Sequence, residues 1–392
     1  MSEFLLNEVC ELIVDCPHTT ANDEGKGFPL VLTPNIGKGR LVYDGMHRVC
    51  EDVYNKRNAR AIPQENDLIF AREATAGNVA LIQKGEKVCL GQRTVLIRPN
   101  QEKVNPAFLT YFLLAPKQQY NLLSTANGAT VAHVNLPTIR NLKIDLPELP
   151  IQQRIATILS RYDSLIENYQ KQIKLLEESA QRLYKEWFID LRFPGHENAK
   201  IVDGVPEGWE KKSIADLGTY LNGFAFKPSD WQERGKPIIK IKEMGNGIST
   251  DTPRNNGERV PEKYLIKSGD LLFSWSATLM VIVWTGEEGW LNQHLFKVTP
   301  TQGIGREFLL QSISKTIAEF SNLTTGSTMK HIQRNKLEQV FVNTPTSEIM
   351  NCYCRIAERQ REQILNISSQ IRHLTEARDR LLPKLMSGEI KV

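Results

Sequence analysis

Cysteine is scarce in this chain of 392 residues, which has six cysteines and no CxxC pair. Such usage fits reduced thiols better than a disulfide framework, and it offers no pattern for structural zinc. The opening segment carries Glu3 and Glu8 where a secretory signal would be basic, so we expect a cytoplasmic protein. The apolar stretch 271–285 is shorter than a membrane span and includes serine and threonine, so we expect core strands there and no membrane contact.

The short motifs that mark many enzymes are also missing. The sequence has no GxxxxGK[ST] phosphate loop, no GxGxxG dinucleotide fingerprint, no HExxH zinc motif, and no Asn-Pro-Pro-aromatic or Asp-Pro-Pro-Tyr tetrapeptide of amino-methyltransferases. Its seven histidines are scattered, and the acidic stretch 230–236 has the wrong spacing for a nuclease. We therefore expect no catalytic residue, no metal site and no cofactor in this chain.

The overall composition is that of a folded globular protein, with 41% hydrophobic and 24% charged residues. Its length suggests two or three domains. The net charge of +4 permits nucleic-acid binding but does not by itself argue for it.

An internal repeat organises the whole sequence. The segment GATVAHVNLPTIRNLKIDLP from residue 128 recurs as GSTMKHIQRNKLEQVFVNTP from residue 326, an offset of 198 that continues without a gap for about sixty positions. Upstream, 67–70 matches 270–273, 90–92 matches 291–293, and the first strand with its glycine turn recurs 208 residues later. The chain is therefore two copies of one unit.

Each copy ends in a long helix with an apolar seam. Between Ile151 and Trp187 apolar residues are spaced by alternating fours and threes, and 349–385 follows nearly the same seam with more polar entries. A helix of this length rises roughly 55 Å and cannot bury such a stripe alone. The seam can pair with a second chain, or the two seams of one chain can pair antiparallel; the repeat favours the latter.

We therefore predict an α+β fold, a pseudo-twofold repeat of two similar globular domains joined by two long antiparallel coiled-coil helices. The predicted boundaries are globular domains at 1–146 and 207–344, spacer helices within 147–190 and 345–386, a linker at 191–206 and a C-terminal tail at 387–392.

Several segments resemble the specificity subunit of Type I restriction-modification systems. They are IQQRIATILSRYDSLIENYQKQIKLLEESAQRLYKEWF from 151, VDGVPEGWE from 202, NGFAFKPSDW from 222, SGDLLFSWSAT from 268, TTGSTMKHIQ from 324 and LLPKLMSGEI from 381. The resemblance implies that each globular domain reads one half of a split sequence in double-stranded DNA and that the helices set the spacing. It also implies docking of two methyltransferase subunits and, through them, restriction subunits. S-adenosylmethionine, ATP and magnesium would belong to those partners.

The two copies differ most where the first has IVDCPHTTAN and FAREATAG and the second has YLNGFAFKPS and FSWSATLM, which suggests two different half-sites. Two alternatives stay open: a coiled-coil adaptor that binds proteins at both ends, and part of a self-contained nuclease-methyltransferase.

Four groups of residues are candidates for DNA contact. The twin turns 125–133 and 324–332 suit a phosphate, with helix capping as the alternative. Residues after the matched strands can reach base edges, with core packing of Trp275 as the alternative. Basic turns and a twin loop suit the DNA backbone, with plain solvated surface as the alternative. In that order the candidates are Asn127, Thr130, His133, Ser327, Thr328, Lys330 and His331; Arg72, Glu73, Thr75, Ser274, Trp275 and Thr278; Lys38, Arg40, Lys240, Lys242 and Asn246; and His18, Thr19, Thr20, Phe226 and Lys227.

A second set of residues lies beside the helix seams and offers apolar surface to a methyltransferase subunit, as in a four-helix contact. This partner-binding set is Ile166, Leu175, Trp187, Ile364 and Leu382.

Overall fold

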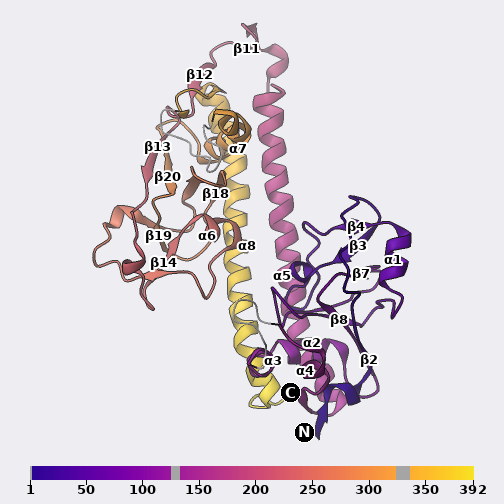
Figure 1. Ribbon diagram of the computed structural model, residues 1–392. Helices are drawn as coiled ribbons and strands as arrows, with labels where there is room; N and C mark the ends of the chain where they lie inside the picture. Colours follow the sequence, from indigo (N-terminus) through magenta and orange to yellow (C-terminus); the bar gives the residue numbers. More distant parts are fainter. Residues whose placement is uncertain (1, 125–132, 324–335) are drawn as a thin grey trace. The chain divides into compact units, whose positions relative to one another are not determined.

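The computed structural model describes residues 2–124, 133–323 and 336–392. The chain divides into unit 1, formed by Met1–Ile166 and Leu374–Val392, and unit 2, formed by Glu167–His373. Both ends of the chain belong to unit 1 (Figure 1). The division falls inside both long helices, whereas the predicted boundaries keep each helix whole, because each half of a helix packs on the globular part of its own unit.

Unit 1 combines three sheets with helices at its end. The sheets have strand orders β2-β8-β5-β6, β4-β3-β7 and β1-β9. In chain order the elements are β1 (Ser2–Leu5), η1 (Leu6–Val9), β2 (Cys10–Asp15), β3 (Phe28–Val31), η2 (Thr33–Asn35), β4 (Arg48–Val49), α1 (Glu51–Arg57), β5 (Leu68–Ala71), β6 (Val79–Leu81), β7 (Cys89–Leu90), β8 (Thr94–Pro99), α2 (Pro106–Leu114), α3 (Pro116–Leu123), α4 (Leu136–Arg140), β9 (Lys143–Leu146) and the first half of α5 (Leu149–Tyr184).

Unit 2 has the corresponding sheets, with strand orders β13-β20-β17-β18, β15-β14-β19-β16 and β12-β21, and an added two-stranded β10-β11. Its elements are the π-helical turn η3 (Lys185–Ile189), η4 (His196–Asn198), β10 (Ile201–Val202), β11 (Val205–Pro206), β12 (Glu210–Ser213), β13 (Gly218–Asn222), η5 (Pro228–Asp230), β14 (Lys236–Ile239), α6 (Ile241–Asn246), β15 (Arg254–Asn255), η6 (Glu262–Tyr264), β16 (Leu265–Ile266), β17 (Leu271–Ser274), β18 (Met280–Val283), β19 (Gly289–Leu291), β20 (Leu295–Pro300), α7 (Arg306–Leu323), β21 (Phe341–Thr344) and α8 (Ser347–Ser387), the last of which ends in unit 1.

The two units pair equivalent strands in the same register. In unit 1, β3 and β7 run parallel with Leu30 opposite Cys89. In unit 2, β14 and β19 run parallel with Ile238 opposite Trp290. These positions differ by 238 − 30 = 208 and 290 − 89 = 201, which are the offsets of the sequence repeat. The repeat is therefore a repeat of three-dimensional structure.

One difference between the units has a clear cause in the sequence. Unit 2 has the single helix α7 where unit 1 has α2 and α3, which are separated at Ala115. Pro116 follows Ala115, and a proline disfavours the helical conformation of the residue before it. Ala115 accordingly takes an extended conformation, with φ −65° and ψ 143°. Unit 2 has Thr316 at the equivalent place, so its helix continues.

The core of each unit lies between its four-stranded sheet and the long helices. In unit 1, Phe70 of β5 and Val95 of β8 share one apolar cluster with Phe108 of α2 and Leu159 of α5. The opposite face of the same sheet packs on a second cluster that contains Ile69. Because both faces are covered, strand β5 is buried at all four positions.

The long helices pair antiparallel, as predicted. In unit 1, Ile155 near the start of α5 shares the core with Leu385 near the end of α8. In unit 2, Tyr184 at the end of α5 lies edge-on to Tyr353 near the start of α8, with 6.4 Å between ring centroids. The start of each helix therefore meets the end of the other, within one chain.

An ion pair between the helices reinforces this pairing in unit 1. Arg378 of α8 donates from Nη1 to Oδ1 of Asp163 on α5 at 2.6 Å, and the Tyr111 hydroxyl donates to Oδ2 of the same carboxylate. Burial raises the pKa of the Tyr111 phenol well above its ordinary value, so it stays a proton donor. Asp163 is only 12% exposed, so these two donors take the place of water around its carboxylate.

We expect Arg378→Ala to lower the free energy of unfolding by about 1.5–3 kcal/mol, because it leaves a largely buried carboxylate with one donor. Urea denaturation measures this. The control is Arg380→Ala on the same helix, whose side chain is 77% exposed and pairs with Glu376 one turn away. Its cost should be close to zero; equal losses in the two variants would contradict the assignment.

Candidate functional site

Polar side chains gather at one end of the four-stranded sheet of unit 1. Strand β2 ends at Asp15, Arg72 directly follows β5, and Arg93 directly precedes β8. Because β8 runs antiparallel to both neighbours, these three positions meet at the same end of the sheet.

Arg72 is the centre of this group. Its Nε donates to the Val134 carbonyl at 2.9 Å, its Nη1 contacts Asp15 Oδ2 at 2.8 Å, and its Nη2 lies 2.8 Å from Nε2 of His133. A guanidinium can only donate, so Nε2 of His133 accepts. The other ring nitrogen, Nδ1, lies 2.6 Å from Glu73 Oε1 and carries the proton in this arrangement.

The group continues outward to Arg93. The second oxygen of Glu73 lies 2.7 Å from Nη1 of Arg93, whose side chain is 61% exposed, whereas the Arg72 side chain is 10% exposed. At the other end, His18 contacts Asp15 at 3.2 Å and is also exposed. These six connected side chains form what we call the sheet-end network: His18, Asp15, Arg72, His133, Glu73 and Arg93. Its inner members are held by several partners, and its two ends reach the surface.

Unit 2 has different residues at the equivalent positions. Trp275 stands in the place of Arg72 and donates from Nε1 to Oδ1 of Asn222, which stands in the place of Asp15, at 3.2 Å. Ser276 Oγ lies 3.2 Å from Nδ1 of His294, a pair that replaces Glu73 and Arg93. Even a backbone bond is common to both units: the amide of Arg72 donates to Arg93, and that of Trp275 donates to His294. The same framework thus carries two arginines and two carboxylates in unit 1, and a tryptophan, an asparagine, a serine and a histidine in unit 2.

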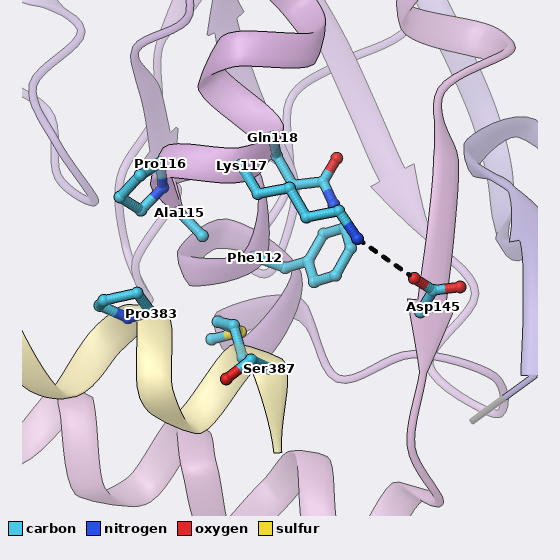
Figure 2. A pocket seen from close by; sticks show the side chains of 9 residues that line it. Phe112, Ala115, Pro116, Lys117, Gln118, Asp145, Pro383 and Ser387 are labelled. Atoms are coloured by element: carbon cyan, nitrogen blue, oxygen red, sulfur yellow. Dashed lines mark ion pairs between the residues drawn. The ribbon is translucent and has the colours of Figure 1, made fainter. Parts of the chain in front are cut away.

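A groove lies at the end of the long helix in each unit. In unit 1 it has a volume of about 200 Å³ and lies between α3, β9 and the end of α8, with Pro116, Asp145 and Met386 among its lining residues. Figure 2 shows Lys117 directed across it to Asp145, at 3.8 Å.

The groove of unit 2 is larger, about 800 Å³, and is lined by the equivalent residues Thr316, Asn343 and Phe188. Two further side chains on its lining, Ile189 and Phe341, are 54% and 47% exposed. The repeat has therefore produced two related grooves with different linings.

Comparison with known proteins decides the family. A family model described as "Type I restriction modification DNA specificity domain" matches residues 1–178 and again 206–375. The chain belongs to this family of DNA specificity domains. The resemblance inferred from the sequence is thereby confirmed, and with it recognition of a DNA sequence as part of a type I restriction-modification complex.

Several specificity subunits are similar along most of their length. The MjaIX specificity subunit of Methanocaldococcus jannaschii is 25% identical over 94% of this chain and 88% of that protein. The HindI specificity subunit of Haemophilus influenzae is also 25% identical, over 76% of this chain and 80% of its own. A crystal structure of the type I restriction-modification S subunit from M. genitalium shares the fold, with a TM-score of 0.55 and 14% identity, and covers 98% of this chain and 95% of its own.

Two residues expected to face DNA are instead buried in this specificity chain. Arg72 is enclosed by the sheet-end network. Ser274 is fully buried, donates to the Thr278 carbonyl and accepts from the amide of Met280 at 3.0 Å. Arg72 is enclosed by Asp15, His133 and Val134, and the Ser274 hydroxyl is enclosed by the turn that leads to Met280. Trp275 is half-buried and packs partly on the core, whereas Thr278 is exposed.

The remaining base-edge candidates and the first twin loop are mostly held by the protein itself. Glu73 pairs with His133 and Arg93, and Thr75 donates to the Thr33 carbonyl at 2.7 Å. The Thr19 carbonyl accepts both Nη groups of the buried Arg57 at 3.0 Å, while His18 and Thr20 keep exposed side chains.

The equivalent loop of unit 2 and the basic turns are more open. Lys227 is exposed, and Phe226 lies half-buried against Phe224 with 4.9 Å between ring centroids. Lys240 lies 4.5 Å from the ring centroid of Trp231, as a cation on an aromatic face.

Lys242 forms an ion pair with Asp251. The ammonium group of Lys242 and the Ser249 hydroxyl together lower the pKa of the Asp251 carboxyl to about 2. Lys38 and Asn246 are exposed, and Arg40 is half-buried. The basic turns therefore retain exposed groups for a ligand, although the charge of Lys242 is largely compensated.

Most residues of the twin polar turns lie outside the described residues: Asn127, Thr130, Ser327, Thr328, Lys330 and His331. Only His133 of that set is described, and it belongs to the sheet-end network.

The partner-binding set also divides by burial. Ile166, Trp187 and Ile364 are buried in the core of this chain, so these side chains offer no surface to another protein. The seam pattern predicts them beside the interface, but Trp187 belongs to the apolar core of unit 2. Leu175 is 64% exposed, and Leu382 is half-buried.

Arg93, Asn222, Ser276 and His294 were not singled out from the sequence. A usable signal existed, because the repeat aligns Arg93 with His294 directly after the matched segments 90–92 and 291–293. No helix in the described ranges is long and apolar enough to cross a membrane. Within those ranges, no group of three or more His, Cys, Asp or Glu residues is placed to hold a metal.

We expect Arg72→Ala to lower the free energy of unfolding by about 2–3 kcal/mol, because Asp15 and the Val134 carbonyl lose a charged donor while largely buried. The loss should be local, so peptides that contain Val134 should exchange their amide hydrogens faster by mass spectrometry. His18→Ala, which removes the exposed partner of the same Asp15, is the matched control and should change neither quantity. Unchanged exchange in Arg72→Ala would refute a clamping role for this arginine.

Proposed function

We propose that this chain reads a bipartite sequence in double-stranded DNA, with 1–146 reading one half and 207–344 the other. The observation that carries the proposal is the sheet end, where two units with the same strand registers present different side chains at equivalent positions. A shared framework with different polar groups suits the reading of two different base sequences, because base edges are distinguished by their patterns of donors and acceptors.

Charge supports contact with the DNA backbone as well. The exposed or partly exposed cations Lys38, Arg40, Lys227 and Lys240 lie on turns of the two globular parts. Such residues neutralise phosphates and give affinity without sequence preference. The specificity would then come from the groups at the sheet ends, whereas the twin polar turns would contact phosphates.

Two half-sites need a fixed separation, and the long helices suit that role. Helix α5 has 36 residues, which corresponds to a rise of about 54 Å. Half-sites read from one face of a duplex lie about 34–36 Å apart per helical turn. An antiparallel pair of stiff helices within one chain would keep the gap between the half-sites constant.

Catalysis would belong to other subunits. We propose that methyltransferase subunits, two per chain, dock on the twofold repeated surfaces, and that restriction subunits join through them. S-adenosylmethionine, ATP and magnesium would bind to those partners. The related grooves of the two units support two copies of one partner, because equivalent surfaces in a repeat bind equivalent ligands. The adaptor and self-contained enzyme alternatives have no specific observation in their favour.

Exchange of one globular domain tests the bipartite reading. Replacing 207–344 by the corresponding domain of another specificity subunit should change one half of the methylated sequence in host DNA and leave the other half as it was. The gap between the halves should stay the same, because both helices are retained. Sequencing of methylated bases reads out all three quantities at once, and a change in both halves would contradict the division of labour.

Partner docking is tested in the groove of unit 2. Ile189→Asp places a charge on an exposed apolar side chain of the groove lining, and we expect the complex to lose one of two methyltransferase subunits. Native mass spectrometry of the co-expressed complex measures the stoichiometry. Ile201→Asp is the control, because Ile201 is equally exposed, at 54%, but does not line the groove. Retention of both partners by Ile189→Asp would exclude this groove as a docking site.

A further inference from the structure

The turn between β7 and β8 holds Arg93 in an unusual backbone conformation. Its φ is 64°, in the left-handed region that residues other than glycine rarely adopt. The Arg93 carbonyl accepts from the amide of Arg72 at 2.9 Å, and Thr94 Oγ1 donates to the Gly91 carbonyl at 2.9 Å. Hydrogen bonds on both sides therefore hold the residue where its conformation is costly. Strain of this kind is concentrated at functional positions in proteins.

The side chain of Arg93 is held in place by a series of connected polar side chains. Glu73 contacts its Nη1 at 2.7 Å, and the other Glu73 oxygen is held by His133. His133 in turn accepts from Arg72, which is anchored on Asp15. The side chains that hold Arg93 in place are all less exposed than Arg93 itself. Its exposed guanidinium is therefore preorganised by a largely buried set of hydrogen bonds and ion pairs.

The contact with Glu73 leaves donors of the guanidinium for an outside acceptor, since this group has five N–H bonds. Two acceptors in DNA fit an arginine: a phosphate, and the O6 and N7 atoms of guanine. The Glu73 carboxylate directly beside Arg93 compensates its charge and would repel a phosphate. A guanine edge carries no net charge and is not penalised in this way, so the geometry favours guanine.

We propose that Arg93 is a specificity-determining residue that reads a guanine in the half-site of unit 1, with Glu73 and His133 as positioning residues. This assignment rests on the proposed function. At the equivalent position unit 2 presents His294, paired with Ser276, so its half-site is read by different groups.

The test uses the full complex, with the chain co-expressed with the modification subunits of its own system, and a duplex library randomised over the recognised sequence. Arg93→Lys keeps the charge but removes the planar fork. We expect discrimination for guanine at one position of one half-site to fall about 10- to 100-fold. The other half-site and the salt dependence of binding should not change.

Two further variants separate a reading role from a structural one. Arg93→Asn removes the side chain but tolerates the left-handed backbone, so it should relax the same position without loss of fold. Glu73→Gln should weaken discrimination at that position while binding to unrelated sequences stays the same or improves, a pattern that simple destabilisation does not produce. Arg48→Lys, an exposed arginine on β4 of the same unit, is the matched control and should leave every position unchanged.

The outcomes are distinct. If Arg93→Asn weakens binding to all sequences equally and lowers the salt slope by about one unit, Arg93 contacts a phosphate and the proposal is wrong. It is also wrong if Arg93→Lys and Arg93→Asn both keep full discrimination. If the unmodified complex shows no preference for a bipartite sequence, the proposed function itself fails, independently of Arg93.

Discussion

The fold depends on the mutual burial of two apolar helix faces. Neither α5 nor α8 could bury a seam of this length alone, and each meets the other antiparallel within the same chain. The start of each helix is therefore fixed on the end of its partner, and the globular parts pack on these paired ends. Tyr184 with Tyr353, and Asp163 with Arg378, show that both aromatic packing and charge support the pairing.

The two units share their backbone features but differ in the side chains at the ends of their sheets. Strand registers, helix ends and even the hydrogen bond between the Arg72 amide and the Arg93 carbonyl recur in unit 2. The side chains at the sheet ends do not recur. Their hydrogen bonds join side chain to side chain, so a different pair can occupy the same backbone positions. Unit 1 pairs Arg72 with Asp15, and at the equivalent positions unit 2 pairs Trp275 with Asn222. Each unit therefore satisfies its polar groups with a different pair of side chains.

Much of the architecture could be predicted from sequence because its signals are local or repeated. The offset of 198 located the long helices, and the offsets of 208 and 201 correspond to strand pairs such as Leu30 with Cys89. The site was less accessible. Arg72 was expected at the surface, since residues after a strand are often exposed, but its burial depends on His133, 61 positions away. No periodicity reports such a contact, and the sheet-end network became visible only in three dimensions.

The sheet-end network also limits how such a domain can change its specificity. Its inner members share buried hydrogen bonds, so replacing Arg72 alone takes a charged donor from Asp15 and from the Val134 carbonyl, at a cost of about 2–3 kcal/mol. Arg93, by contrast, is mostly exposed and loses only a partly solvated ion pair when it is replaced. The outer position can therefore vary at little cost in stability among residues that tolerate its left-handed backbone, such as asparagine, while the inner positions must change in pairs. Arg93, the group proposed to read DNA, is thus also the member of the sheet-end network that is easiest to exchange.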